Sequence, residues 1–508
     1  MEKAKQRVQL SKAIDPFVLA LDVGSTASRG DVYDAAGRPV EGGREKVPHQ
    51  FRTAGDGTSE IDPEQVVEEL SQIIGGLATE QLEGRIGGVA LDTFASSLIG
   101  VSANGSAVTP CYTYADTRCA PQATALRREL KEAEVHQRTG CRLHTSYLAP
   151  RLRWLREAHP DEFQAAARWM SLGEYAYLKL LGTTAAGTST AAWTGLLDRS
   201  SGAWDPRMLT AAGVEAHQLS EIRNPDQPLT NVDEGIARRW PALAGASWFA
   251  PISDGFASNL GTGADERTAA ALAAATSGAI RVLVDEIPDR FPSGLWCYRV
   301  DARRSLIGGA INDVGRAVAW LQSTLELGDA DLNQLMAATP DPVTPLVMPY
   351  FTGERAPGWA TGARAVFARV SAATTSPLMF RGGMEGVALT YARVATALKA
   401  TAANPQRILA SGRVTQDLPG WLQVVADVLD AVVEPVTIKR ATLHGTALHA
   451  LEVLAPTTPR APTPTSDALH PLPQHRSYYQ ERATEYEKLY VALNEPDSLA
   501  APAIVGRR

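Results

Sequence analysis

Two aspartates, Asp22 and Asp254, stand in similar settings and are the first candidates for chemistry. Each follows a short apolar run and precedes small residues: Val-Gly-Ser-Thr after Asp22, and Gly after Asp254 in a Ser-Asp-Gly turn. A carboxylate at the end of a strand can hold Mg²⁺ through water, or it can accept the proton of an attacking hydroxyl. Two such turns predict two similar lobes that face one cleft. Asp22 would then bind a metal ion together with a nucleotide, and Asp254 would act on the hydroxyl of the acceptor molecule.

The segment after Asp22 has the composition of a phosphate-binding turn. Backbone N–H groups of a Gly/Ser-rich hairpin point into one concavity, and the hydroxyls of Ser25 and Thr26 add donors beside Gly24. A plain hairpin with a capping aspartate explains the same residues, and Asp254 alone is also typical of a turn. The chain contains neither a Walker A pattern nor GxGxxG, which removes P-loop and dinucleotide-binding explanations.

Two further segments combine charged and aromatic residues. Asp116 and Arg118 follow a predicted strand within Tyr112–Arg118, near a chain reversal. An Asp and an Arg at this spacing can hydrogen-bond vicinal hydroxyls of a polyol, or they can simply pair on the surface. Gly353–Trp359 contains a turn, a Glu-Arg pair and an aromatic ring, and a proline-punctuated loop explains it equally well.

The segment Leu409–Arg413 and the predicted helix Trp421–Asp427 together could seat a purine. Trp421, however, stands at helical spacing from Val425, which is typical of a core side chain. The segment therefore supports a nucleotide site only in combination with the other motifs.

Strands and one strong helix are predicted around Asp22. The helix is Pro63–Leu77, whose apolar side chains recur at helical spacing behind the capping residue Asp62. Asn104-Gly105 is a hairpin signal. The predicted strands are Phe17–Asp22, Gly30–Tyr33, Arg38–Val40, Ile86–Leu91 and Ser97–Val101. This order of elements predicts an α/β lobe.

The second half of the chain repeats part of this pattern. Residues 140–240 are predicted to be mostly helical, and Thr276–Asp285 then resembles Ser25–Asp34: a small-residue turn, an arginine, a strand and an aspartate. This internal similarity favours duplication of one lobe. Pro456–Pro473 is rich in Pro and Thr and is predicted to be irregular, and Tyr478–Leu493 is predicted to form an amphipathic helix.

Length and composition indicate a protein of two packed domains. A chain of 508 residues exceeds one hydrophobic core, and 44% apolar with 21% charged residues is typical of soluble globular proteins. We predict an N-terminal lobe over 1–249, a C-terminal lobe over 250–455, and a Pro-rich segment with a helix over 456–508.

Charge and cysteine content restrict the partners. A net charge of −7 argues against a nucleic-acid partner. The four cysteines form no CxxC pair, so neither zinc nor disulfides are predicted. No apolar run is long enough for a membrane span, and the charged N-terminus does not resemble a signal peptide, so a cytoplasmic location is expected.

Six motifs in one order make the chain similar to the FGGY carbohydrate kinases. The resemblance covers about residues 17 to 455 and includes Gly308-Gly-Ala-Ile-Asn312. The six motifs are Asp22-Val-Gly-Ser-Thr, Tyr-Ala-Asp116-Thr-Arg118, Ser-Asp254-Gly, Thr-Ser-Gly278-Ala-Ile-Arg, Gly-Glu-Arg355-Ala-Pro and Trp-Leu-Gln-Val-Val-Ala-Asp427.

The resemblance implies an α/β, two-lobed, actin-like ATPase (ribonuclease H-like) fold with a small-molecule sugar and MgATP in the cleft. By this match Asp254 is the general base and Asp22 the metal-associated aspartate, with ATP and Mg²⁺ as cofactors. A homodimer is expected by analogy alone. The remaining matched positions are Ser96, Asp116 and Arg118 for the sugar, and Gly24, Ser25, Thr26, Thr276, Ser277, Gly278, Asn312 and Gly412 for ATP and its phosphates.

Within the family, the chain looks most like the gluconate-kinase branch, through its Ser-Asp-Gly-x-x-Ser-Asn-Leu-Gly and Thr-Ser-Gly-Ala-Ile-Arg motifs. Arg281, which ends the second motif, would suit an acidic sugar or form a structural ion pair. Phe94-Ala95-Ser96 includes the position where relatives carry a Met-His pair that faces the sugar. Ala275, Arg413 and Arg369 stand where the family has glycines, and a Cβ at the first two could crowd phosphate or purine.

The function predicted from this resemblance is ATP-dependent phosphorylation of a terminal hydroxyl of a sugar or sugar acid. A gluconate-like acid is the leading substrate candidate. A ketopentose such as xylulose, or another polyol, is the runner-up, because one or two pocket contacts decide specificity. A non-catalytic sugar-sensing protein is the alternative of another class. An actin- or chaperone-type ATPase would not explain the Tyr-Ala-Asp-x-Arg and Gly-Glu-Arg motifs.

Overall fold

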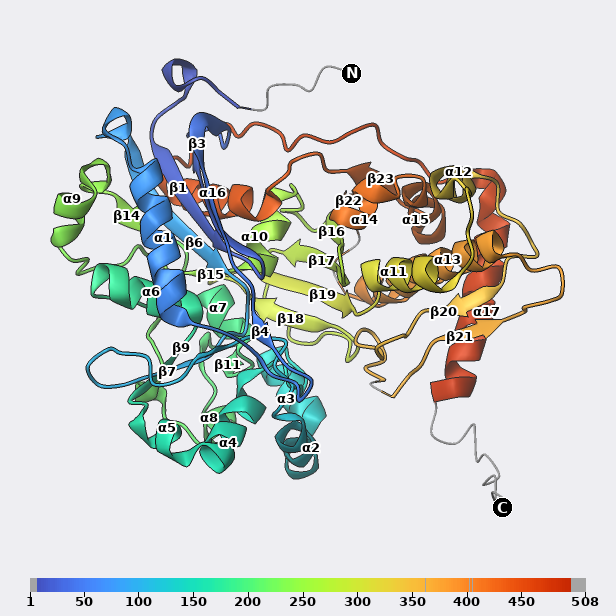
Figure 1. The fold of residues 1–508 in the computed structure, drawn as a ribbon, viewed down its shortest axis with the longest axis horizontal. Coiled ribbons are helices and arrows are strands. Elements are labelled where there is room, and N and C mark those ends of the chain that lie inside the picture. The colour runs from blue at the N-terminus through green and yellow to red at the C-terminus, as the bar shows by residue number, and fades with distance from the viewer. Residues whose placement is uncertain (1–6, 361, 402, 404, 495–508) are drawn as a thin grey trace.

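The structure is a computed structural model that describes residues 7–360, 362–401, 403 and 405–494, and it shows two α/β lobes (Figure 1). Each lobe is built on a six-stranded sheet. The outer ends of the first and last predicted domains, residues 1–6 and 495–508, lie outside the described residues. No helix in the described part is long and apolar enough to cross a bilayer.

The first lobe is centred on a sheet with the strand order β14-β6-β1-β2-β3, and β15 also pairs with β6. β1 and β2 form the predicted hairpin, with Asp22 opposite Arg29. β1 runs parallel to β6, which brings Asp22 beside Asp92. The strands are β1 (Phe17–Val23), β2 (Ala27–Tyr33), β3 (Pro39–Pro48), β6 (Ile86–Thr93), β14 (Ser247–Trp248) and β15 (Ile252–Ser253).

Both faces of β1 are covered, so all its side chains are buried. Leu19 and Leu21 pack in one apolar cluster with α1 (Pro63–Leu77), which has the bounds predicted from its periodicity and begins at the predicted cap Asp62. On the alternate face, Val18 and Ala20 pack against α16 (Ala441–Leu454). A strand enclosed on both sides reads as a continuous apolar run, as β1 does.

The second lobe has the strand order β18-β19-β17-β16-β22-β23. β16 forms a hairpin with β17 and runs parallel to β22, just as β1 pairs with β2 and β6. The repeat predicted from Thr276–Asp285 is therefore a repeat of strand arrangement. The strands are β16 (Ala269–Ala274), β17 (Gly278–Val284), β18 (Trp296–Arg299), β19 (Ser305–Ile311), β20 (Leu346–Met348), β21 (Val366–Ala368), β22 (Arg407–Ser411) and β23 (Val432–Pro435).

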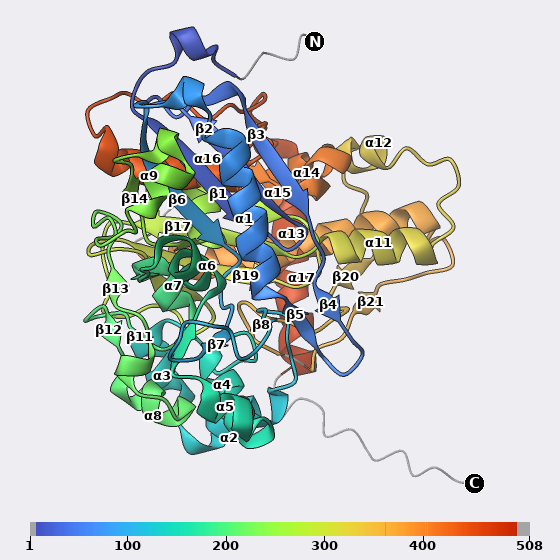
Figure 2. The ribbon, with the colours of Figure 1, turned by 60° about the vertical axis from the view of Figure 1, so that its left-hand side comes forward.

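A region of short helices and short strands extends below the first sheet (Figure 2). Residues 140–240, predicted to be mostly helical, contain short strands between the helices as well. The helices of this region are α2 (Ala120–Glu129), α3 (Glu132–Thr139), α4 (Leu148–Ala158), α5 (Pro160–Ala165), α6 (Leu172–Leu181), α7 (Thr188–Trp193), α8 (Pro206–Ala212) and α9 (Gly235–Arg239). The short strands of this lobe are β4 (Arg52–Thr53), β5 (Ser59–Ile61), β7 (Ile99–Val101), β8 (Cys111–Tyr112), β9 (Arg168–Met170), β10 (Ala186–Gly187), β11 (Leu197–Asp198), β12 (Ala203–Trp204) and β13 (Ile222–Arg223).

The C-terminal part of the chain follows the prediction. The Pro-rich segment contains no α-helix or named strand and ends at the short 3-10 helix Pro473–His475. Helix α17 (Arg476–Asn494) covers the range of the helix predicted after it. All four cysteines are free and buried. The other helices of the second lobe are α10 (Asp254–Gly261), α11 (Gly315–Thr324), α12 (Leu332–Ala337), α13 (Ser376–Lys399), α14 (Arg413–Asp417) and α15 (Trp421–Leu429).

The two lobes are joined by a close crossing of α10 and α16. A Cβ on Gly261 would overlap the carbonyl oxygen of Ala441, and a Cβ on Gly445 would overlap that of Ala257. Glycine at both positions lets the two backbones touch. Because α10 carries Asp254 and α16 packs on the first sheet, this crossing fixes the start of α10 relative to the first lobe.

Candidate active site

A cavity of about 400 Å³ lies beside Asp254, with walls from both lobes. Ser96, Tyr114 and Trp193 come from the first lobe, and Ser277 and Arg355 come from the second. A concave pocket with aromatic walls and a few convergent polar groups is the usual form of a small-molecule site.

Asp254 is the first residue of α10, and the prediction that it lies in a turn was wrong. Ser-Asp-Gly is typical of turns, but here the chain continues into the helix that crosses α16. The Gly255 N–H donates to Asp254 Oδ1 at 2.8 Å. Burial raises the pKa of Asp254 to about 6, although Arg281 opposes this shift. A carboxylate with such a pKa is a suitable general base near neutral pH.

Arg281 lies on β17 and holds the start of α10. Its Nη1 donates to the carbonyl oxygen of Gly255 at 2.6 Å, and its positive charge acts on Asp254. The guanidinium also lines the cavity. Arg281 is therefore part of the site, where it favours the ionised form of Asp254.

Asp22 lies at the end of β1 between the guanidinium of Arg29 and the carboxyl group of Asp92. Its Oδ2 accepts a hydrogen bond from Arg29 Nη1 at 2.9 Å, and Asp92 stands beside it on β6. Burial raises the pKa of Asp22, and the negative charge of Asp22 in turn raises the pKa of Asp254. Asp22 is thus within electrostatic range of Asp254.

Asp92 is a site carboxylate that the sequence analysis missed. Its Oδ2 accepts a hydrogen bond from the Thr446 hydroxyl of α16 at 2.6 Å, and its carboxyl group also interacts with that of Asp22. Burial, together with the charge of Asp22, raises the pKa of Asp92 well above its ordinary value. Its position in the sequence could have identified Asp92, because it follows an apolar stretch as Asp22 does.

The carboxylates fit a magnesium ion that arrives with a nucleotide. Within the described ranges, no group of three or more His, Cys, Asp or Glu side chains could form a metal cage. Mg²⁺ usually keeps several waters and binds to one or two carboxylates and to substrate phosphates. Asp22, with Asp92 beside it, supplies a donor set of that kind.

The predicted phosphate-binding turns are both hairpin turns at sheet ends. Ser25 and Thr26 are exposed between β1 and β2, and Thr276 is exposed between β16 and β17. The second turn is tied to the start of α11, because the Gly315 N–H donates to the carbonyl oxygen of Ala275 at 2.8 Å. Ser277 and Gly278 line the cavity.

Gly412 lies against the end of β16, so the structure brings the predicted adenosine turn next to the second phosphate turn. Its φ of +112° favours glycine, and a Cβ there would overlap the Ala274 backbone. Arg413 starts α14 with its side chain 86% exposed and paired with Asp417. The Arg413 side chain therefore extends into solvent.

Asp116 and Arg118 form a pair in which Asp116 is buried and Arg118 is partly exposed, and neither lines the cavity. Arg118 Nη2 donates to Asp116 Oδ2 at 2.6 Å and to Glu60 at 3.1 Å, and the Ser59 N–H donates to the same Asp116 oxygen. Asp116 is fully buried, which rules out a surface pair. The pair anchors the loop that carries Tyr114 into the cavity, and direct sugar contact stays a prediction.

Two other predicted ligand residues have their polar groups engaged. Ser96 lines the cavity with φ +58°, and its hydroxyl donates to the carbonyl oxygen of Trp193 at 2.6 Å. Asn312 Nδ2 donates to the Gly353 carbonyl at 2.9 Å, and its Oδ1 accepts from Arg355 Nε at 2.6 Å. Asn312 thus holds the loop that carries Arg355.

Aromatic rings form one wall of the cavity. The rings of Trp193 and Tyr298 stack with centroids 3.7 Å apart, and Trp296 stacks on Tyr298 at 4.7 Å. The hydroxyls of Tyr298 and Tyr147 share a hydrogen bond of 2.6 Å. Trp296 and Tyr298 lie on β18, whereas Trp193 ends α7 about 100 residues earlier, so no local motif identified the wall.

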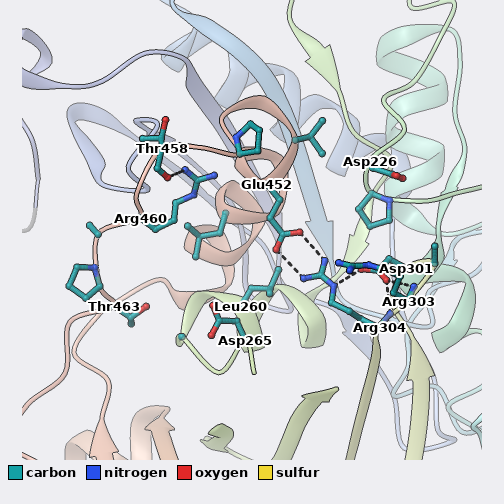
Figure 3. Close-up of a pocket in the computed structure, with 18 residues that line it drawn as sticks. Asp226, Leu260, Asp265, Asp301, Arg303, Arg304, Glu452, Thr458, Arg460 and Thr463 are labelled. Atoms are coloured by element: carbon teal, nitrogen blue, oxygen red, sulfur yellow. Dashed lines mark hydrogen bonds and ion pairs between the residues drawn. The ribbon is translucent and has the colours of Figure 1, made fainter. Parts of the chain in front are cut away.

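A second cavity, of about 850 Å³, is lined by residues from the C-terminal ends of α10 and α16 (Figure 3). Its charged groups are largely engaged with the protein. Arg304 pairs with Glu452 at 2.8 Å and with Asp301 at 2.5 Å, and Arg460 donates to backbone carbonyls. The smaller cavity beside Asp254 is therefore the candidate active site.

Replacing Asp92 by Asn should stabilise the protein at neutral pH by about 1–3 kcal/mol, because the amide cannot ionise in this buried position beside Asp22. The raised pKa means that the contribution of Asp92 to stability is present at low pH and is lost as pH rises through the folded-state value. The gain in the thermal unfolding midpoint should therefore be largest near pH 8 and vanish towards pH 4.

The exposed Asp329, changed to Asn, is the matched control and should leave the midpoint unchanged. An equal gain from Asp92→Asn at every pH, or a loss at pH 8, would contradict the raised pKa.

Comparison with known proteins agrees with this geometry. Residues 17–261 match the N-terminal domain, and residues 270–452 the C-terminal domain, of the FGGY family of carbohydrate kinases. A gluconokinase of Bacillus subtilis (strain 168) is 26% identical over 453 residues, which cover 85% of this chain and 86% of that protein.

Solved structures share the fold. A gluconate kinase from Lactobacillus acidophilus superposes with a TM-score of 0.87 at 24% identity, covering 94% of this chain and 98% of that one. A xylulose kinase from the same organism gives the same TM-score and identity, covering 94% and 99%. The two-lobed, actin-like ATPase fold predicted from the sequence is thereby confirmed. The chain belongs to the FGGY family of carbohydrate kinases.

Proposed function

We propose that the protein transfers the γ-phosphoryl group of ATP to a terminal hydroxyl of a gluconate-like sugar acid. The observation that carries this proposal is Asp254, a carboxylate with a pKa of about 6 in a cavity that both lobes enclose. The β16–β17 turn supplies phosphate-binding backbone at the same cavity. Phosphoryl transfer depends on positioning and charge stabilisation more than on covalent participation by the protein.

Asp254 accepts the proton of the acceptor hydroxyl as that oxygen bonds to the γ-phosphorus and the bond to the ADP oxygen breaks. Arg281 keeps Asp254 ionised before the transfer. Asp22 would hold Mg²⁺ through water, and the ion would offset the charge of the phosphates. Enclosure of the acceptor between the lobes keeps water from competing as the nucleophile.

Two observations support an acidic acceptor. The cavity contains the guanidinium groups of Arg281 and Arg355, which favour an anionic ligand. The similarity to the gluconokinase of Bacillus subtilis points the same way. Xylulose phosphorylation is the second candidate, because the fold is equally similar to that of a xylulose kinase. A cytoplasmic homodimer is proposed by analogy with the family alone.

A coupled ADP-release assay across gluconate, other aldonates, ketoses and polyols tests the proposal. The highest kcat/KM is expected for gluconate or a close aldonate. Turnover of xylulose alone would favour the second candidate. No acceptor-dependent ADP release with any compound would favour a sugar sensor, and ADP release without an acceptor would favour an ATPase.

A further inference from the structure

Arg355 is a guanidinium in the active-site cavity with unused donors. Its Nε donates to Asn312 Oδ1 at 2.6 Å, and Asn312 is itself held by the Gly353 carbonyl, so the side chain is fixed from one edge. In the part of the chain that the structure describes, no carboxylate forms an ion pair with Arg355, and its two Nη groups have no hydrogen-bond partner.

The surroundings of Arg355 do not compensate its charge. The neighbours that act most on it electrostatically are Tyr147, Tyr298, Arg316 and Tyr114, and none is a carboxylate. Burial lowers the pKa of Arg355, yet a guanidinium stays charged in proteins. Arg355 is only partly exposed, and a guanidinium partly withdrawn from water is stabilised by a charged partner. An anionic ligand would supply that partner.

The aromatic wall connects Arg355 to the base. Gly255, next to Asp254, lies against the Trp193 ring, because a Cβ at this glycine would be 3.0 Å from Trp193 Cζ2. Trp193 stacks on Tyr298, and Tyr298 is an electrostatic neighbour of Arg355. Asp254, the stacked rings of Trp193 and Tyr298, and Arg355 therefore all line the same cavity.

We propose that Arg355 binds the carboxylate of the acceptor, away from the hydroxyl that Asp254 activates. The inference rests on the proposed function, because an open-chain aldonate carries its carboxylate and its terminal hydroxyl at opposite ends. A guanidinium presents paired N–H donors that match a carboxylate. The transferred phosphoryl group is the other anion that could reach Arg355. If Arg355 bound that group instead, its replacement would lower kcat without changing the Kd for the acceptor.

The test compares binding and turnover in Arg355→Met and Arg355→Lys. Calorimetry without ATP should show the Kd for gluconate rising by at least about 30-fold in Arg355→Met, since a charge-assisted bond is lost. The Kd for sorbitol, a neutral polyol of the same length, should stay within about 3-fold. KM for gluconate should rise with Kd, while kcat at saturation should change far less. Arg355→Lys should fall between Arg355→Met and wild type.

Arg316→Gln is the matched control, because it removes a neighbouring exposed positive charge and should leave the gluconate Kd unchanged. Unchanged gluconate binding in Arg355→Met overturns the inference. So does an equal loss for gluconate and sorbitol, or a fall in kcat without a change in Kd, which assigns Arg355 to the phosphoryl group. If Arg355→Met does not fold, the same comparison in Arg355→Lys decides.

Gluconate binding and phosphorylation by the wild-type protein distinguish a failure of the inference from a failure of the proposed function. Gluconate that binds through Arg355 without being phosphorylated would refute the function and keep the inference. Gluconate that is phosphorylated equally well by Arg355→Met would refute the inference and keep the function. A wild type that binds no aldonate overturns both.

Discussion

Asp254→Asn is expected to lower kcat by about 10²–10⁴-fold, the range typical of a lost general base. Asn has nearly the same shape, and its side-chain oxygen can still accept the Gly255 N–H that Asp254 Oδ1 accepts. The substitution should therefore leave the thermal unfolding midpoint and the gluconate Kd close to those of the wild type. Loss of turnover with retained acceptor binding would identify a defect in chemistry.

The same carboxylate predicts the acid limb of the pH profile. Asp254 acts as a base only when it is deprotonated, so kcat should fall about tenfold per pH unit below its pKa of about 6. Arg281→Met should move this limb to higher pH, because the positive charge that lowers the pKa of Asp254 is removed. A kcat that is flat from pH 5 to 8, or full activity in Asp254→Asn, would show that another group is the base.

Gly445→Ala is expected to destabilise the protein by about 1–3 kcal/mol or more, the scale of overpacking in a core. The new Cβ would overlap the carbonyl oxygen of Ala257, so α10 and α16 must separate. Because α10 begins with Asp254, the displacement should also lower kcat. Thermal unfolding and the ADP-release assay measure the two effects.

Gly75→Ala is the matched control for this prediction. It makes the same change within helix α1, where the new Cβ would lie 3.8 Å from the nearest neighbour, Trp240 Nε1. It should raise stability by about 0.4–1 kcal/mol, as Gly→Ala does at an unstrained position. If Gly445→Ala also stabilises the protein and keeps full activity, the helices do not depend on their close contact.

The elements around Asp22 could be predicted because their signals are local. Pro63–Leu77 was correct at both ends, since its apolar periodicity, proline and cap all agree. Strand lengths were less accurate. β2 begins at Ala27 instead of Gly30, and β3 extends from Pro39 to Pro48, because pairing with a neighbour lengthens a strand beyond its own apolar residues.

The site was only partly predictable because distant segments build it. Asp92 is bonded to Thr446, which lies about 350 residues later in the chain. The cavity wall combines the Trp193 ring of α7 with the rings of Trp296 and Tyr298 on β18. Arg369, by contrast, departs from the family pattern in residue type. It occupies a glycine position of the family signature and has a left-handed φ of +61°, a backbone conformation that favours glycine.

Glu354 and Arg355 are neighbours in sequence with separate tasks. Glu354 accepts hydrogen bonds from Tyr490 of α17 at 2.5 Å and from Arg393 of α13 at 2.7 Å, whereas Arg355 enters the cavity. Helix α17 thus anchors the loop that presents Arg355. Under the proposed role of Arg355, the choice of acceptor depends on α17 as well as on the cavity. Truncations or fusions that disturb α17 would then change acceptor preference without any change in the residues that line the cavity.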